Sequence, residues 1–181
     1  MPEGESAREG GVSKKLGCIF CRSGSEDALV QALRRVHPEL EALSPRRVRI
    51  RRSGGKAVAE TAPLFPGYIF FRTADEPDFR TFVRQKHLYR LLTYSGGDWV
   101  LHGADRAVAS LMFEHRGVIG LSKAFYVGDA IRVTEGAMKG REAAIVKFNR
   151  RAMTAQVKLD FMGKTLCLWL GYELIDPVTT E

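Results

Sequence analysis

The stretch Pro63-Leu64-Phe65-Pro66-Gly67-Tyr68-Ile69-Phe70-Phe71-Arg72 decides the fold of the first half of the chain. Its apolar run over residues 68–72 predicts a strand. Side chains on a strand alternate between two faces, and here both faces are apolar, which is typical of a strand covered on both sides. One face carries Tyr68, Phe70 and Arg72, and the other carries Ile69 and Phe71.

A second strand, predicted over residues 16–22, has the same character, because Cys18, Phe20 and Arg22 share one apolar face. We expect the helices to lie mainly on one face of this sheet. The face with Phe20 and the Tyr68-Phe70 pair is then left to another protein or to a second domain, since aromatic side chains with an arginine rim are typical of interfaces. The alternative is that a loop covers this face.

Helical periodicity appears at three places in the first half of the chain. Ser25 is a suitable N-cap for a helix from Glu26 to about His37, and acidic residues occupy its first turn. A second helix is predicted to start at Asp75 or Glu76, and a third spans about 105–114. With short strands near 91–94 and 99–102, this order predicts an α+β sandwich.

The chain after Phe125 shows no helical periodicity. Glycines and Asn149 separate five predicted short strands, and five strands in so few residues indicate a small closed β-barrel. We therefore divide the chain into a tail (1–15), a first domain (16–114), a linker (115–123) and a barrel domain (124–178). The predicted strands are 127–134, 141–149, 154–160, 164–170 and 172–175.

The composition excludes several classes of protein. The 181 residues include 28 Lys and Arg and 21 Asp and Glu, a net charge of 28 − 21 = +7, and no apolar run approaches the roughly 18 residues of a membrane helix. The first fifteen residues are polar and lack the apolar core of a signal peptide, so they indicate a disordered tail. Three cysteines make no disulfide framework, which favours a reduced, cytoplasmic protein.

Basic residues are concentrated in the segment 46–56, which holds six cations and no acid. Arginines alternate with Val48 and Ile50, a period that predicts a strand with one basic face, and Ser53-Gly54-Gly55 predicts a hairpin turn. Two interpretations remain open. The hairpin is either a solvated edge that prevents aggregation or a contact to a phosphate backbone.

Two motifs in the chain resemble the NusG family of transcription elongation factors. The segment 63–70 is similar to the signature of the NusG N-terminal (NGN) domain. Residues 127–133, followed by Glu135-Gly136 and Gly140, resemble the KOW motif, and the two occur in the NusG order. The resemblance implies a ferredoxin-like NGN sheet, a five-stranded SH3-like KOW barrel and a non-enzymatic monomer with no cofactor, metal or membrane.

The resemblance also implies a binding face for RNA polymerase. The family binds the clamp helices of the polymerase through aromatic side chains that correspond here to Phe20, Phe65, Tyr68 and Phe70. Arg22 corresponds to a region near the non-template DNA strand in specialised members. The four aromatic residues form the face that the alternation of the strands leaves uncovered.

The segment Ala137-Met138-Lys139 is shorter than the apolar loop with which housekeeping members bind Rho or a ribosomal protein. The barrel instead resembles the LoaP group of specialised paralogues, which implies antitermination and binding of a nascent RNA hairpin. A housekeeping NusG is the alternative function, and solvated turn residues are the alternative role for the cations. The candidate RNA-binding residues in or beside turns are Lys139, Arg141, Lys147, Arg150, Arg151 and Lys164.

Cys18 and Cys21 have the spacing of a redox or metal motif, and a thiol-based redox enzyme is the alternative from another class. Their thiols fall on opposite strand faces if residues 18–21 are extended, and no second cysteine or histidine pair follows at zinc-finger spacing. We therefore expect neither a metal site nor a catalytic centre.

Overall fold

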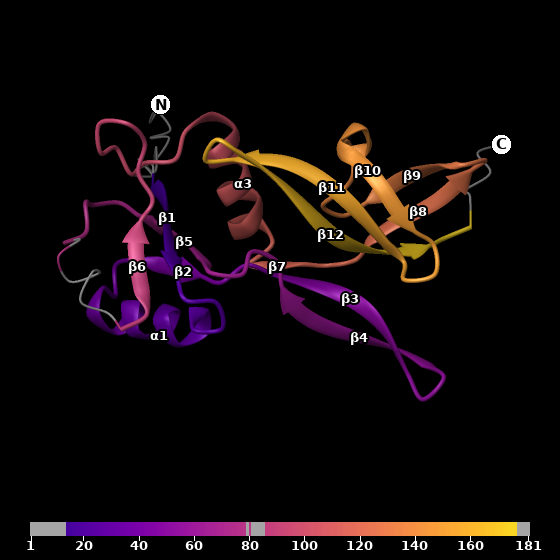
Figure 1. Cartoon of the computed structure of the whole chain (residues 1–181), viewed down its shortest axis with the longest axis horizontal. Coiled ribbons are helices and arrows are strands. Elements are labelled where there is room, and N and C mark those ends of the chain that lie inside the picture. Colours follow the sequence, from indigo (N-terminus) through magenta and orange to yellow (C-terminus); the bar gives the residue numbers. More distant parts are fainter. Residues whose placement is uncertain (1–13, 79, 81–85, 177–181) are drawn as a thin grey trace, which may run out of the picture.

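The computed structural model describes residues 14–78, 80 and 86–176 (Figure 1). Its leading sheet has the strand order β2-β5-β1-β6, and β5 pairs antiparallel with β1 along six residues, from Lys15 opposite Thr73 to Phe20 opposite Tyr68. The apolar run after Gly67 is thus a central strand, as predicted. The strands of this sheet are β1 (Lys15–Cys21), β2 (Glu41–Leu43), β5 (Tyr68–Thr73) and β6 (Leu88–Leu91).

Two helices cover opposite faces of this sheet. α1 (Glu26–Val36) packs on the face of Ile19 and Phe71, whereas α3 (Gly103–Glu114) packs on the face of Cys18 and Phe70. The expectation that the helices lie mainly on one face is therefore wrong for α3, because both faces are apolar and each must be covered. Most of the helix predicted after Asp75 lies outside the described residues. None of the helices in the described part is long and apolar enough to cross a membrane.

The segment predicted as a strand near 99–102 is a loop. Trp99 and Leu101 are buried, but the backbone N–H of Leu101 makes a single bond to the Leu16 carbonyl in place of a ladder. Its apolar residues fill gaps on the two sides of the sheet. Burial, which the sequence pattern indicates, does not require a strand here.

The basic segment forms the predicted hairpin. β3 (Arg46–Ser53) pairs antiparallel with β4 (Lys56–Pro63), and Gly54 and Gly55 make the turn with positive φ angles of 57° and 78°. Positive φ at both central residues is the geometry that favours glycine in a two-residue hairpin. β7 (Val118–Ile119) adds a short parallel strand to β3, so part of the predicted linker is held on the hairpin.

The second half is a curled five-stranded sheet with the order β10-β11-β12-β8-β9, consistent with an SH3-like barrel. Three predicted boundaries are wrong. The predicted strand 141–149 starts only at Ile145, because Glu142–Ala144 form a 3₁₀ helix. The predicted strand 127–134 is interrupted by a turn at Gly128, and the predicted strands 164–170 and 172–175 are one strand. The elements are β8 (Ser122–Val127), β9 (Ala130–Glu135), the 3₁₀ helix η1 (Glu142–Ala144), β10 (Ile145–Asn149), β11 (Thr154–Phe161) and β12 (Lys164–Leu174).

Gly171 lies within β12 and does not end the strand. A Cβ atom at this position would lie 2.7 Å from the Val48 carbonyl oxygen and 2.5 Å from the Leu121 side chain. The glycine thus allows the barrel to approach the backbone of β3, and it marks a close contact within a strand, not a turn. The hairpin extends from the leading sheet along the barrel (Figure 1).

Candidate functional site

The predicted aromatic face is assembled by β1, β5 and the loop before β5. The Phe20 and Tyr68 rings are 5.2 Å apart, and the Phe65 and Phe70 rings are 5.8 Å apart in an edge-to-face arrangement. Phe65 and Tyr68 are 6.3 Å apart, so the four rings form one continuous patch. We call these four residues the aromatic face.

Phe161, at the end of β11, covers the aromatic face. Its ring lies 5.4 Å from Phe70, 6.1 Å from Tyr68 and 6.2 Å from Phe65. Phe65 and Phe70 are 3% and 0% exposed, whereas Phe20 and Tyr68 remain half-buried. The barrel domain, together with α3, therefore covers the face that the alternation of the strands left open.

Asp105 of α3 fastens the β11–β12 turn over this face. One carboxylate oxygen accepts a 2.7 Å hydrogen bond from the Met162 backbone N–H, and the other accepts a 2.6 Å bond from the Tyr94 hydroxyl. Burial and the bond to Asp105 raise the pKa of Tyr94. Sequence reasoning missed Asp105, because nothing local indicates a partner 57 residues further along the chain.

Buried Glu26 supports the loop that precedes β5. Its carboxylate accepts hydrogen bonds from the backbone N–H of Gly67, at 2.6 Å, and of Gly24, at 2.7 Å. Gly67 has a φ of +84°, and a Cβ there would lie 3.0 Å from the Cys21 carbonyl oxygen and 3.1 Å from the Phe20 ring. Glycine is thus required where the loop passes behind the aromatic face.

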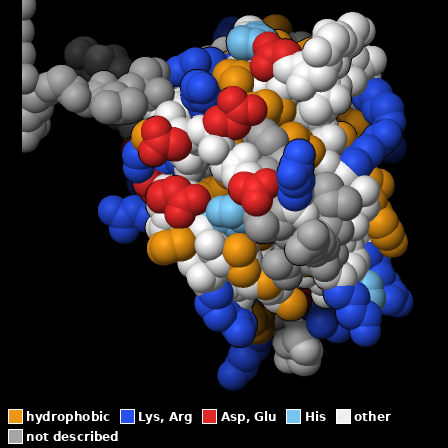
Figure 2. All heavy atoms as spheres, turned by 90° about the vertical axis from the view of Figure 1, so that its left-hand side faces the viewer, with side chains coloured by type: hydrophobic (Ala, Val, Ile, Leu, Met, Phe, Trp, Pro, Cys, Tyr) orange, Lys and Arg blue, Asp and Glu red, His pale blue; other side chains and the backbone are white. Residues whose placement is uncertain are grey.

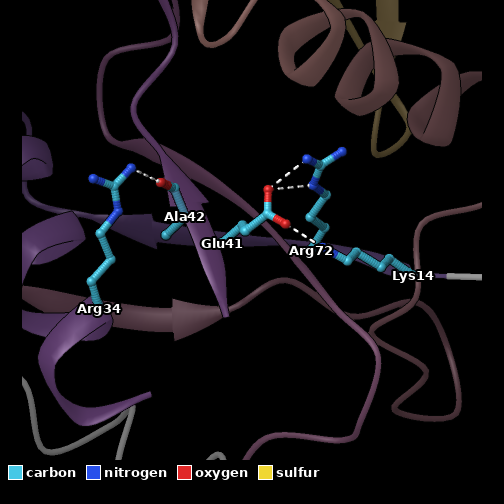
Figure 3. A network of polar contacts seen from close by, with 5 residues as sticks. All are labelled: Lys14, Arg34, Glu41, Ala42 and Arg72. Carbon is cyan, nitrogen blue, oxygen red and sulfur yellow. Dashed lines mark hydrogen bonds and ion pairs between the residues drawn. The ribbon is translucent and has the colours of Figure 1, made fainter. Parts of the chain in front are cut away.

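Arg72 does not lie free at the rim of this face. Its guanidinium donates a 2.7 Å hydrogen bond to Glu41, which also accepts from Lys14, and Figure 3 shows both cations turned toward this one carboxylate. Arg72 further lies 4.8 Å from the centre of the Phe113 ring. Beside this network, Arg34 donates to the Ala42 carbonyl at 2.8 Å and secures β2. These contacts hold the edge of the sheet together.

An exposed aromatic edge remains beyond the covered rings. Tyr89 of β6 is 58% exposed and lies 5.7 Å from Phe20, and the Arg90 guanidinium lies 5.9 Å from the same ring. Sequence reasoning missed Tyr89, although an aromatic residue between Leu88 and Leu91 is a signal for a strand with one aromatic face. Arg22 is exposed directly after β1.

The segment around Gly67 lies within the part of the chain that a family model matches. The model described as transcription termination factor nusG matches residues 18–111, just over half of the chain. The chain belongs to the NusG family. Members of this non-enzymatic family act in transcription together with RNA polymerase.

A solved NusG is also similar to this NusG-family chain. The structure is described as domain interaction in Thermotoga maritima NusG, and its sequence is 18% identical. The match covers 88% of the present chain and 94% of the Thermotoga chain, with a TM-score of 0.46. No match is found among curated proteins.

The cations that the NusG resemblance assigns to RNA are divided among several surfaces. Lys139 and Arg141 lie before η1, where Arg141 donates to the Ala137 carbonyl at 3.0 Å. Lys164 lies at the opposite end of β11 from the turn that holds Arg150 and Arg151. Exposed Lys147 lies on β10.

Arg150 and Arg151 are adjacent in this NusG-family chain, but their side chains lie on different surfaces. The Arg150 guanidinium lies 4.4 Å from the centre of the Tyr126 ring and packs against the barrel. Arg151 points to a groove that it shares with the arginines of β3. The far end of the NGN domain, by contrast, carries a group of Asp and Glu side chains with Lys and Arg around them (Figure 2).

The surroundings of Cys18 and Cys21 in this family member oppose a reactive pair. Cys18 and Cys21 are buried, and burial raises the pKa of both thiols, that of Cys21 to about 11. A redox nucleophile needs a lowered pKa, so this environment opposes the thiol-enzyme alternative. The described part of the chain holds no group of three His, Cys, Asp or Glu side chains placed to bind a metal ion.

Proposed function

We propose that this chain is a specialised NusG-type elongation and antitermination factor that binds the clamp helices of RNA polymerase through its aromatic face. The proposal is supported by membership of the family and by four contiguous rings from β1, β5 and the preceding loop. Buried aromatic side chains are the usual anchors of protein interfaces. Phe20 and Tyr68 are already partly exposed, and Phe65 and Phe70 become more accessible when the barrel domain moves away.

The observation that carries the proposal is the continuous patch of four rings, three of which contact Phe161 of the barrel domain. A polymerase that binds these rings must displace Phe161. The chain then exists in a closed state, as in this structure, and an open state that binds polymerase. Polymerase shifts the population toward the open state by its difference in affinity for the two.

The short loop after β9 supports the specialised function over the housekeeping one. Ala137 and Met138 are 4% and 0% exposed, and the Met138 N–H bonds to the Ser122 hydroxyl at 3.3 Å. These apolar residues face the core, so Lys139 is the loop side chain that they leave to solvent. We propose that the barrel uses Lys139, Arg141, Lys147, Arg150, Arg151 and Lys164 to contact a nascent RNA hairpin, and that Arg22 lies near the non-template DNA strand.

Polymerase binding by single variants tests the proposal. Tyr68→Ala should weaken binding to core RNA polymerase by about tenfold or more, because it removes an anchor. Phe161→Ala should strengthen binding, because the closed state no longer competes and the apparent affinity rises with the open fraction. Phe148→Ala is the matched control, since Phe148 is a half-buried barrel aromatic that packs against Tyr126.

Circular dichroism of each variant confirms that the domains fold. If Phe161→Ala weakens polymerase binding as strongly as Tyr68→Ala does, the aromatic face is part of the interior only and the proposal fails. For the antitermination role, multi-round transcription through a terminator is compared with and without the upstream leader. Equal readthrough on both templates would contradict recruitment by RNA.

A further inference from the structure

A basic groove lies between the β3–β4 hairpin of the first domain and the β10–β11 turn of the barrel. Its volume is about 630 Å³, which is within the range of binding pockets. Two domains supply its walls, and β12 supplies part of its floor. The residues that carry the argument are Arg47, Arg49, Arg51, Arg52, Arg151 and Trp169.

Positive charge in this groove is poorly compensated. Five arginines line it against one carboxylate, Glu60, a balance of 5 − 1 = +4. Glu60 accepts a 2.6 Å hydrogen bond from Arg49 and lies 3.7 Å from Arg51. Within the described residues, Arg52 and Arg151 are exposed and have no ion-pair partner. An anionic ligand would relieve the mutual repulsion of these groups.

Arg47 adds a second observation. Its Nε is buried without a hydrogen-bond partner among the described residues, and burial together with Arg49 lowers the pKa of its guanidinium. A buried donor atom without a partner is costly unless something compensates it. The side chain lines the groove, so a phosphate there would place negative charge beside this guanidinium.

Trp169 gives the groove an aromatic surface. Its side chain is half-buried on β12, lines the groove and makes no ring contact with another described aromatic residue. Indole rings stack well on unpaired bases, whereas the bases of a duplex are already stacked and paired. Arginines beside a free tryptophan are therefore typical of a site for a single strand.

We propose that this groove binds a short single-stranded nucleic acid, with phosphates on the arginines and a base on Trp169. The proposal goes beyond the proposed function, because it needs no polymerase and places most of its cations in the first domain. The two walls are brought together where Gly171 of the barrel approaches Val48 of the hairpin. The ligand therefore binds the closed state and stabilises it over the open one.

Fluorescence anisotropy of the full chain tests this site. The probes are fluorescein-labelled oligouridylate and oligothymidylate of about ten nucleotides. Trp169→Ala should weaken binding about fivefold or more. Arg52→Ala and Arg151→Ala should each reduce the slope of log affinity against log salt by about 0.7. Arg106→Ala is the matched control, because Arg106 is exposed on α3 and does not line the groove.

Gly171→Ala separates a groove from a merely basic hairpin. The added Cβ pushes the barrel from β3 without removing charge, so binding should fall about as far as with Trp169→Ala. Wild-type affinity in both variants, or a loss with Arg106→Ala equal to that with Arg52→Ala, would overturn the proposal. Tighter binding of the same sequence as a duplex would also overturn it. A preference for ribose identifies a transcript as the source, and a preference for deoxyribose identifies a displaced DNA strand.

Discussion

The ring of Phe161 lies 5.4 Å from the ring of Phe70, tilted by 64°, although the two residues belong to different domains. Phe70 is fully buried in the leading sheet, and Phe161 is 2% exposed at the end of β11. One apolar cluster thus continues from the first domain into the barrel. Separating the domains removes Phe161 from this face, so the contact couples the arrangement of the domains to the availability of the aromatic face.

Loss of Asp105 should loosen the barrel. Asp105→Ala removes the acceptor of both the Met162 N–H and the Tyr94 hydroxyl, at an expected cost of about 1–3 kcal/mol in closing the domains. Amide hydrogen exchange of β5 and of the β11–β12 turn should become faster. Asp98→Ala is the control, because Asp98 bonds to His102 and the Val100 N–H within its own loop. Equal protection of these amides from exchange in Asp105→Ala and wild type would show that Asp105 does not hold the β11–β12 turn in place.

Gly67→Ala should destabilise the first domain by about 1–3 kcal/mol, because alanine is strained at a φ of +84° and its Cβ meets the Cys21 carbonyl oxygen. Urea unfolding measures the effect. Gly55→Ala is the matched control, since it has a φ of +78° but open space around its Cβ. A loss at Gly55 as large as that at Gly67 would mean that backbone strain alone is responsible.

Stability should fall in acid partly through Glu41. Hydrogen bonds from Lys14 and then Arg72 lower the pKa of this carboxyl below its ordinary 4.5. A lowered pKa in the folded state stabilises the protein above the unfolded pKa, and this contribution is lost as the pH falls through the folded value. The contribution is small, about 1 kcal/mol or less, because the pair is half exposed.

Glu41→Gln isolates this effect. The free energy of unfolding of the variant should change less than that of wild type between pH 5 and strongly acidic solution, while the two converge at the acid end. Chemical denaturation at a series of pH values gives the comparison. Parallel curves for the two proteins would show that Glu41 does not contribute.

Cysteine reactivity should be uneven. Cys167 is exposed, whereas Cys18 and Cys21 are buried with raised pKa values. Titration of the native chain with a thiol reagent at pH 8 should therefore show one fast thiol, and unfolding should release the other two. Cys167→Ser should abolish the fast phase. A fast second thiol in that variant would revive a reactive Cys18-Cys21 pair.

Strand alternation made the two cores of the leading sheet predictable. It placed Cys18 with Phe70 and Ile19 with Phe71, and these pairs lie in separate apolar clusters. The hairpin turn at Gly54-Gly55 was predictable for the same reason, since turn chemistry and strand period are local properties of the sequence. The roles of the aromatic face and the barrel cations stay predictions.

Contacts between the domains were not predictable. Phe161 precedes a Met162-Gly163 turn and has no local feature that distinguishes a covering ring from a barrel core residue. Gly171 follows the pattern of a turn, but its absent side chain accommodates the Val48 carbonyl. The groove between Arg151 and the hairpin depends on that same approach. Such long-range contacts are set by packing of finished elements, and no period in the sequence reports them.

The connection between β7 and β8 limits how the molecule can open. Only Gly120 and Leu121 separate the two strands, so the Cα atoms of Ile119 and Ser122 are at most about 11 Å apart, and β7 is itself hydrogen-bonded to β3. The barrel therefore stays close to β3 unless β7 separates from β3. A barrel displaced by a partner stays at high effective concentration and returns as soon as the partner leaves, so the partner's residence time sets how long the chain stays open.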